Sequence, residues 1–149
     1  MGDQVTQHNI GGMVDGVYAS AAASATAAGT GDNATTTGIS IDRMSFSGSM
    51  PRSALFTTVF DATLVSGATL SIGYALQDSQ DGSNWSDYQT AAKSVVSTGG
   101  SGGSTNKGQL NVQVDLNSAR RYVRYNTVQD LSAGGTDTSL TRSVAVLGG

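Results

Sequence analysis

The sequence predicts an all-β protein, an antiparallel β-sandwich of jelly-roll type with an extended N-terminal segment. Short runs that alternate apolar and polar residues recur along the chain. Turn signals rich in Gly, Asn and Asp separate these runs at roughly 8–12 residue intervals, as in sandwiches and barrels. The 149 residues include no Glu and only two Lys. The surface must therefore be built from Ser, Thr, Asn and Asp, which suit strand faces and turns rather than helices.

The first 37 residues carry few bulky side chains, and residues 19–28 are almost entirely Ala, Ser and Thr. Ala favours a helix, but Ser and Thr weaken one, and no apolar stripe with a helical period is present. We therefore expect residues 1–37 to form an extended arm or flat edge strands, with a polar loop at 29–37. The sandwich domain is expected to span residues 38–149.

Alternating residues at 39–46 predict the first strand of this domain. A turn at 48–52, which contains the one proline, precedes a strand at 54–63. Apolar residues fall on both faces of that strand, which predicts burial on both sides. The strict alternation of apolar and smaller residues at 70–76 predicts a half-buried strand.

An Asp-Gly turn at residues 78–84 predicts a β-hairpin after this strand. The later elements follow from alternation between Gly-rich turns, and about eight strands in all would fit a jelly roll. We expect a returning strand at 85–91, a separate short strand at 93–98, a flexible loop at 99–105, and strands at 110–116, 121–128 and 139–147.

Charge and composition exclude several classes of protein. The net charge is −3 and the charges are dispersed, which argues against a nucleic-acid partner because phosphate binding needs a basic stripe. No apolar run approaches the roughly 20 residues of a membrane helix. The first ten residues lack the basic and apolar pattern of a signal peptide, so we expect synthesis in the cytoplasm.

Catalytic residues are scarce in this sequence. The chain has no Cys, and its one histidine, His8, lies in a polar segment near the terminus, where we expect it to face solvent. Ser47 is followed by a turn, and no base is marked out for it. No carboxylate pair of the kind a glycosidase needs stands out among Asp61, Asp78, Asp81, Asp87 and Asp115. We therefore expect a non-catalytic protein without a cofactor.

The hairpin turn at residues 78–84 is a weak candidate for a calcium site. Asp78 and Asp81 would supply the hard oxygen ligands that calcium prefers. However, the loop lacks the spacing and the terminal Glu of a helix–loop–helix calcium site. A turn closed by Asp and Asn side chains, with Gly82 at positive φ, explains the same residues better.

Arg120, Arg121 and Arg124 form the one basic cluster. On a strand, Arg120, Tyr122 and Arg124 share one face and Arg121 lies on the other. Arginine beside tyrosine is a common pairing at protein interfaces. The alternative is a solvated strand whose arginines bind nearby aspartates, and the sequence does not decide between the two.

Aromatic residues near the hairpin allow two interpretations. Trp85, Tyr88 and Tyr74 could form a platform for a sugar ring. Tryptophan in a sandwich is more often a core residue, and that interpretation is favoured for Trp85. The candidates for an interface are Trp85, Tyr88, Arg120, Arg121, Tyr122 and Arg124.

Two segments resemble capsid decoration (cement) proteins of tailed bacteriophages. The first is Leu-Gln-Asp-Ser-Gln-Asp-Gly-Ser-Asn-Trp-Ser-Asp-Tyr at residues 76–88, which is followed by a Gly-rich loop. The second is Arg-Arg-Tyr-Val-Arg-Tyr at 120–125, and the closing strand at 143–147 also fits. The resemblance covers residues 39–147, and the Ala-rich N-terminal segment matches nothing in it.

The resemblance implies a jelly-roll or related sandwich on the outer surface of a virion capsid, made in the host cytoplasm. Such a protein bridges neighbouring major capsid proteins and is expected to self-associate there as a dimer or trimer. Many weak contacts multiplied by avidity would suffice for binding. Sugar-binding sandwiches and phage tail proteins use similar hairpins, so a carbohydrate-binding module of a tail or fibre is the alternative.

Overall fold

The computed structural model describes residues 14–46 and 49–148. Within them the chain forms strands, connections and one short 3-10 turn, η2 (Arg43–Ser45), but no α-helix. No helix of the described ranges is long and apolar enough to cross a membrane. The expectations for His8 and Ser47 lie outside the described residues. The strands are β1 (Val14–Tyr18), β2 (Ala23–Thr26), β3 (Thr35–Thr36), β4 (Ile41–Asp42), β5 (Ser53–Leu64), β6 (Thr69–Ser79), β7 (Ser86–Thr98), β8 (Ser104–Asp115), β9 (Tyr122–Leu131) and β10 (Thr138–Gly148).

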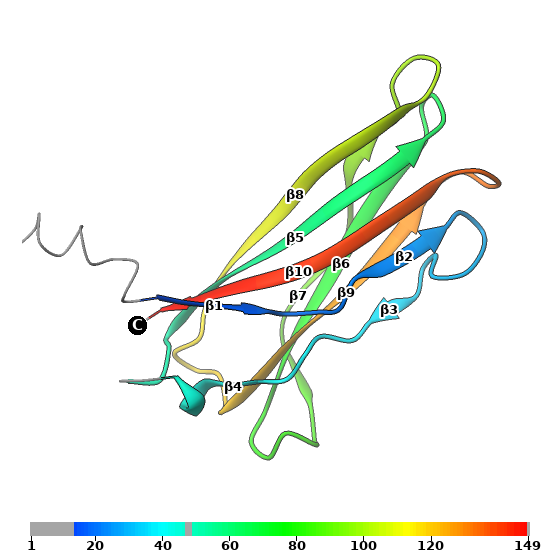
Figure 1. The fold of residues 1–149 in the computed structure, drawn as a ribbon. Helices are drawn as coiled ribbons and strands as arrows, with labels where there is room; N and C mark the ends of the chain where they lie inside the picture. Colours follow the sequence, from blue (N-terminus) through cyan, green and yellow to red (C-terminus); the bar gives the residue numbers. More distant parts are fainter. Residues whose placement is uncertain (1–13, 47–48, 149) are drawn as a thin grey trace, which may run out of the picture.

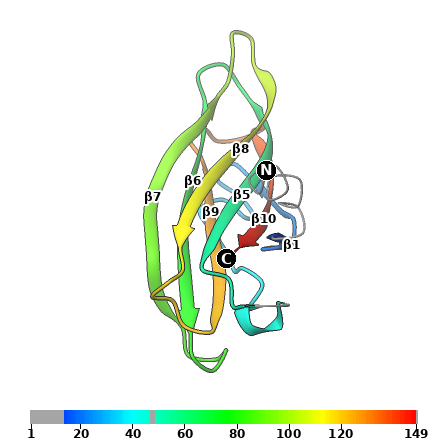
Figure 2. The ribbon, with the colours of Figure 1, turned by 90° about the vertical axis from the view of Figure 1, so that its left-hand side faces the viewer.

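These strands form two antiparallel sheets that pack face to face (Figure 1; Figure 2). Sheet A has the order β1–β10–β5–β8, and β2 also pairs with β10. Sheet B has the order β3–β9–β6–β7, and β4 also pairs with β9. If β1 with β2, and β3 with β4, each count as one position, eight positions lie four to a sheet in the strand order of a jelly roll. The predicted antiparallel jelly-roll sandwich is confirmed.

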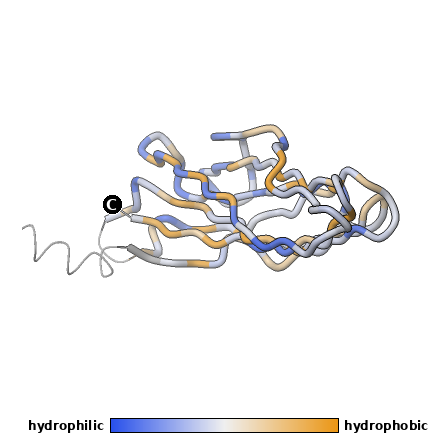
Figure 3. Tube along the Cα trace, turned by 90° about the horizontal axis from the view of Figure 1, so that it is seen from above, coloured by the Kyte–Doolittle hydropathy of each residue, from blue (hydrophilic) through white to orange (hydrophobic). Residues whose placement is uncertain are grey.

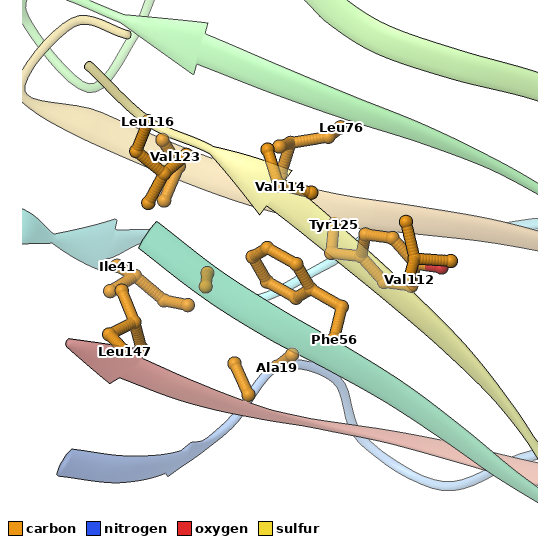
Figure 4. Close-up of a cluster of buried hydrophobic side chains, with 12 residues drawn as sticks. Ala19, Ile41, Phe56, Leu76, Val112, Val114, Leu116, Val123, Tyr125 and Leu147 are labelled. Atoms are coloured by element: carbon orange, nitrogen blue, oxygen red, sulfur yellow. The ribbon is translucent and has the colours of Figure 1, made fainter. Parts of the chain in front are cut away.

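The core lies between the sheets because buried and exposed residues alternate along long strands such as β5 and β10 (Figure 3). One hydrophobic cluster surrounds Phe56, whose ring stacks on Tyr125 with centroids 4.6 Å apart (Figure 4). A second cluster contains Phe60, which follows Thr58 by two residues and therefore lies on the same face of β5. The buried polar residues of the long strands separate the clusters and include Thr58, Thr127, Gln129, Ser139, Thr141 and Ser143. Two pairs among them bond to each other, Thr58 with Ser143 at 2.8 Å and Ser139 with Gln129 at 2.6 Å.

The strand predicted at residues 39–46 is wrong over most of its length. Only Ile41 and Asp42 pair in a sheet, and η2 follows at once. The Asp42 carboxylate accepts a hydrogen bond from the N–H of Met44 at 3.0 Å and so caps this turn. The Arg43 side chain turns inward and is only 1% exposed. The alternation of apolar and polar residues does not predict the burial of an arginine.

Two further strand predictions need correction. β5 is not buried on both sides, because Val59 on its outer face is 43% exposed while Phe56 and Phe60 face the core. The strands predicted at 85–91 and 93–98 are one strand, β7. Its pairing with β6 shifts register at three points, so β-bulges interrupt the alternation that the sequence suggested.

Residues 14–36 supply three edge strands of the same sandwich. β1 and β2 pair with successive parts of β10, and β3 pairs with β9. Ala25 and Ala27 are buried in the second hydrophobic cluster, where β2 lies close against the core. The small side chains of the Ala-rich segment thus allow a short strand to close one edge of sheet A.

Candidate functional site

The β6–β7 hairpin, the β8–β9 connection and η2 lie at the same end of the sandwich (Figure 1). Five of the six predicted interface residues gather there, on or beside the outer face of sheet B. Hydrogen bonds and ring contacts within the chain hold them in place. The five are Trp85, Arg120, Arg121, Tyr122 and Arg124.

The carboxylate of Asp81 closes the hairpin turn. Its Oδ1 accepts hydrogen bonds from the N–H groups of Ser83 and Asn84, both at 2.8 Å. The side-chain amide of Asn84 donates to Oδ2 at 2.7 Å, and the Ser79 hydroxyl donates to Oδ1 at 3.0 Å. The backbone bonds foremost hold the pKa of Asp81 far below its usual range. Gly82 takes φ +79°, as this tight turn requires.

The two calcium candidates have separate partners. Asp78 faces Arg120, whereas Asp81 binds its own turn. Across residues 14–46 and 49–148 no three His, Cys, Asp or Glu side chains are placed to hold a metal ion. The geometry matches the turn that the sequence favoured over the metal site.

Arg120 links the hairpin to the β8–β9 connection. Its guanidinium donates to Asp78 Oδ1 at 2.8 Å and to the Asp78 carbonyl at 3.0 Å, and its N–H donates to Oδ2 at 2.8 Å. The Asp78 side chain is 8% exposed and that of Arg120 is 39% exposed. Burial alone would raise the pKa of Asp78, but these bonds from Arg120 hold it below the usual value.

Arg121 forms a second ion pair, with Asp42. Two parallel bonds of 2.9 Å join Nε to Oδ1 and Nη2 to Oδ2. The hydrogen bond from Arg121 is the main reason that the pKa of Asp42 lies below its usual value. The guanidinium carbon also lies 5.0 Å from the centre of the Tyr122 ring. β4, η2 and the start of β9 are thereby tied together.

Arg124 lies across the ring of Trp85, with its guanidinium carbon 4.4 Å from the ring centre. Its Nε donates to Gln77 Oε1 at 2.8 Å, and the same oxygen accepts from Asn126 at 3.0 Å. Trp85 is partly exposed and belongs to neither hydrophobic cluster. The expectation that Trp85 is a core residue is therefore wrong, because the hairpin carries the indole onto the outer face of sheet B.

Tyr88 does not join the other five residues. It packs against the first hydrophobic cluster, and its hydroxyl donates to the carbonyl of Asp115 at 2.5 Å. Tyr74 is likewise turned inward, where its ring stacks on Tyr125 with centroids 5.3 Å apart. Both tyrosines thus support the fold between the sheets, and neither adds to a platform beside Trp85.

Arg43 is the residue of this end that sequence reasoning missed. Its Nε and Nη2 donate to the carbonyl of Pro51, and Nη2 also donates to that of Leu116 at 2.9 Å. Nη1 donates to the carbonyls of Ala119 and Arg120 at 2.7 and 3.0 Å. Burial is the main cause that lowers the pKa of this guanidinium. Arg43 positions the connection from which Arg120 and Arg121 extend.

A shallow groove runs along the outer face of sheet B beside the Trp85 cluster. Its volume is about 480 Å³, and its floor includes Gly73 and Ala75. The amides of Gln77 and Asn126 line it, and Gln77 also binds Arg124. Lys93 lies along the groove and is paired with Asp130 at 2.8 Å. The groove therefore offers neutral hydrogen-bonding groups, and Gln77 connects it through Arg124 to Trp85.

The two ion pairs match the alternative in which these arginines bind nearby aspartates. The six residues nominated as an interface remain a prediction in that role. What the geometry establishes is a rigid, internally bonded surface, made by residues far apart in the sequence. Such a surface is preorganised for contact without further ordering.

No protein-family model matches the chain, and no curated protein matches it. The chain is similar to the solved structure of infectious bursal disease virus, Gx strain (19% identity, TM-score 0.49), over 90% of this chain and 31% of that chain. It is also similar to the VP2 subviral particle of that virus (20% identity, TM-score 0.43), with 90% and 32% covered. The chain thus spans about a third of the length of the structures it matches. The jelly-roll assignment follows from the strand order, and these similarities add nothing to it.

Proposed function

We propose that this chain is a non-catalytic virion protein that decorates a phage capsid and stabilises it by bridging major capsid proteins. One observation carries the proposal. The two segments on which the resemblance to decoration proteins depends, residues 76–88 and 120–125, form one unit joined by the Asp78–Arg120 ion pair and the Trp85–Arg124 stack.

The state of the charged residues supports a structural rather than a chemical role. Asp42, Asp78 and Asp81 each bind an arginine or the turn backbone, and all three have lowered pKa values. Such carboxylates stay ionised at neutral pH and make poor proton donors. Arg43 is bound to backbone carbonyls alone. These groups fix loops at one end of the sandwich, as a module that binds by surface complementarity requires.

Decoration would work through many equal contacts. A compact sandwich with a preorganised end can bind each copy of a repeated lattice weakly. Simultaneous contact with two neighbours then raises the effective affinity, because the second contact is made at high local concentration. Bridging in this way would resist separation of the neighbouring capsid proteins.

The test mixes the purified chain with capsids from which the decoration protein is absent. We expect the chain to sediment with the capsids at a fixed copy number, and the decorated shells to open at a higher temperature than bare ones. Light scattering during heating measures that opening. Absence of both binding and thermal gain would contradict the proposal.

A second candidate is a carbohydrate-binding module of a phage tail or fibre. The specific observation is that Trp85 lies outside the core, next to a groove lined by the amides of Gln77 and Asn126. Aromatic rings and amides together are suited to sugar rings and their hydroxyl groups. A glycan array probed with the wild-type chain and with Trp85→Ala tests this function. Glycan binding that Trp85→Ala abolishes would favour it over capsid decoration.

A further inference from the structure

The outer face of sheet A carries a cluster of exposed apolar residues from three strands. Tyr18 is 58% exposed, Leu140 49%, Val59 43% and Val146 40%. The register places them together, because Tyr18 pairs with Val144, Val59 with Arg142 and Leu55 with Val146. A shallow hollow of about 370 Å³ lies along β1 and β10 beside Tyr18. We call the surface formed by Tyr18, Val59, Leu140, Arg142 and Val146 the sheet A patch.

Arg142 stands at the centre of the sheet A patch, and no acidic group of the described residues pairs with it. Its guanidinium carbon lies 3.8 Å from the centre of the Tyr18 ring. Its Nε is buried and has no hydrogen-bond partner in the part of the chain that the structure describes. The buried Nε is out of a partner's reach, whereas the rest of the partly exposed guanidinium can donate to an incoming carboxylate.

The surroundings of the sheet A patch resemble the rim of a protein interface. The outward positions beside the patch on β5 and β8 include neutral polar residues such as Thr57 and Asn111, which bond to each other at 2.8 Å. Stable interfaces combine an apolar centre, which includes aromatic residues and Arg, with a polar rim. The acidic group nearest in register, Asp61, is opposite Lys107 and 3.5 Å from its Nζ.

We propose that the sheet A patch is a docking surface for an apolar protein surface that carries a carboxylate, which binds Arg142. On the proposed function, on which this inference rests, that surface belongs to a major capsid protein. The carboxylate would bond to the guanidinium from the solvent side while aliphatic side chains of the partner cover Val59, Leu140 and Val146. Bridging needs more than one contact surface, and the sheet A patch lies on the opposite side of the sandwich from Trp85 and Arg124.

A second copy of this chain fits the patch less well. A two-fold contact would set the same face against itself, so a carboxylate that meets Arg142 would have to come from this face. The described acidic residues at or near this face are already engaged, Asp61 with Lys107 and Asp115 with the N–H of Asn117. A partner that brings a free carboxylate of its own is therefore the better fit.

Capsid binding by matched variants tests the inference. Val59→Asp places a negative charge in the sheet A patch, and Arg142→Met removes the cation. The control Ser101→Asp places the same charge at an exposed position of the connection between β7 and β8. We expect the first two variants to bind undecorated capsids at least ten times more weakly than wild type, and the control to bind as wild type does. Unfolding in urea checks that each variant is folded.

Thiol labelling gives an independent readout, because the natural chain has no Cys. Leu140→Cys should react with a maleimide in the free protein and be protected on the capsid. Wild-type binding that Val59→Asp and Arg142→Met leave unchanged, with the introduced thiol still reactive on the capsid, would overturn this inference and leave the proposed function standing. A dimer of the free chain that Arg142→Met dissociates would also overturn it, in favour of a second copy. Failure of the wild type to bind any capsid would instead overturn the proposed function.

Discussion

The outer faces of the two sheets treat their arginines in opposite ways. On or beside sheet B, Arg120 and Arg121 are paired with Asp78 and Asp42, and Arg124 is bound to Gln77. On sheet A, Arg142 lies on Tyr18 among exposed aliphatic residues and has no acidic partner within the described residues. The arginines of sheet B thus find their partners within the chain, whereas Arg142 on sheet A finds no acidic partner among the described residues.

The number of arginines in a segment and their pairing in the fold point to different faces of the molecule. Three arginines in five residues draw attention in the sequence, yet each of them has a structural partner inside the fold. A single arginine in a closing strand draws none, although it lacks an acidic partner among the described residues and lies among exposed apolar side chains. Charge density along a sequence is thus a weaker guide than charge balance in the folded molecule.

The largest expected effect on stability separates Arg43 from Arg142. Arg43→Met should lower the free energy of unfolding by about 3–5 kcal/mol, because each buried carbonyl left without a donor costs roughly 1 kcal/mol or more. Three carbonyls lose their donor, those of Pro51, Ala119 and Arg120, and that of Leu116 keeps only the N–H of Ala119. Arg142→Met, which removes no such bond, should change it by less than about 1 kcal/mol. Urea unfolding monitored by tryptophan fluorescence measures both.

Arg43→Lys separates the effect of the positive charge from that of the guanidinium's shape. Lysine keeps the charge but cannot reproduce the forked guanidinium, so it should restore little of the loss. Equal stability of Arg43→Met and Arg142→Met would show that the two arginines do not differ as described. The exposed Arg52 serves as a neutral control, since Arg52→Met removes an arginine from the same region.

A smaller effect is expected at the hairpin. Asp78→Asn should lower the free energy of unfolding by about 2 kcal/mol, because the charge-assisted bonds to Arg120 are lost from a nearly buried site. The value lies at the lower end of the range for buried pairs because Arg120 is 39% exposed and solvent screens it. Urea titration at pH 7 measures the loss. No loss in Asp78→Asn would mean that the outer end of sheet B does not depend on this pair.

Much of the fold could be predicted from the sequence, and the errors have particular physical causes. Alternation revealed β6, β8 and β10 because each has one face against the core. It failed for β7, whose bulges break the period, and for Arg43, whose guanidinium is buried by bonds to carbonyls that lie far away in sequence. The residues around Arg43 in the sequence do not predict which distant backbone carbonyls its side chain binds.

The site was predictable in part for the same reason. Hairpin chemistry identified Asp81 and Gly82 because their bonds are local. The Asp42–Arg121 pair joins residues 79 positions apart, so only the fold reveals it. Trp85 was assigned to the core on residue type alone. The β6–β7 hairpin in fact extends at one end of the sandwich and carries Trp85 out of the core (Figure 1). The patch around Arg142 combines β1, β5 and β10 and has no signature along the chain.

Acid should weaken the hairpin end before the sheet A patch. The pKa of Asp81 is lower in the folded chain than its unfolded value of about 3.9. Its contribution to stability is therefore present above about pH 4 and is lost as the pH falls through the folded pKa. We expect the urea midpoint to fall from about pH 4 to about pH 2 in wild type and to fall less steeply in Asp81→Asn. Parallel pH profiles for the two proteins would contradict this role for Asp81.

The smallest expected effect concerns the stack of Arg124 on Trp85. A cation over an indole at a partly exposed site contributes about 0.5–1 kcal/mol. A double-mutant cycle with Trp85→Leu and Arg124→Met should therefore give a coupling free energy of that size in urea unfolding. The matched cycle on sheet A uses Tyr18→Leu and Arg142→Met, whose groups are closer, 3.8 Å against 4.4 Å.

The two cycles distinguish a contact that only supports the fold, Trp85–Arg124, from one that also takes part in binding, Tyr18–Arg142. Arg124 is also fixed by Gln77, so its coupling to Trp85 should persist unchanged when a partner binds. Arg142 Nε has no second anchor among the described residues, so its coupling to Tyr18 should change once a partner carboxylate binds the guanidinium. Repeating both cycles as capsid-binding affinities then gives coupling for the Tyr18–Arg142 pair and little for the Trp85–Arg124 pair. Coupling that appears in binding only for Trp85–Arg124 would reverse the assignment of the faces and place the contact surface on sheet B.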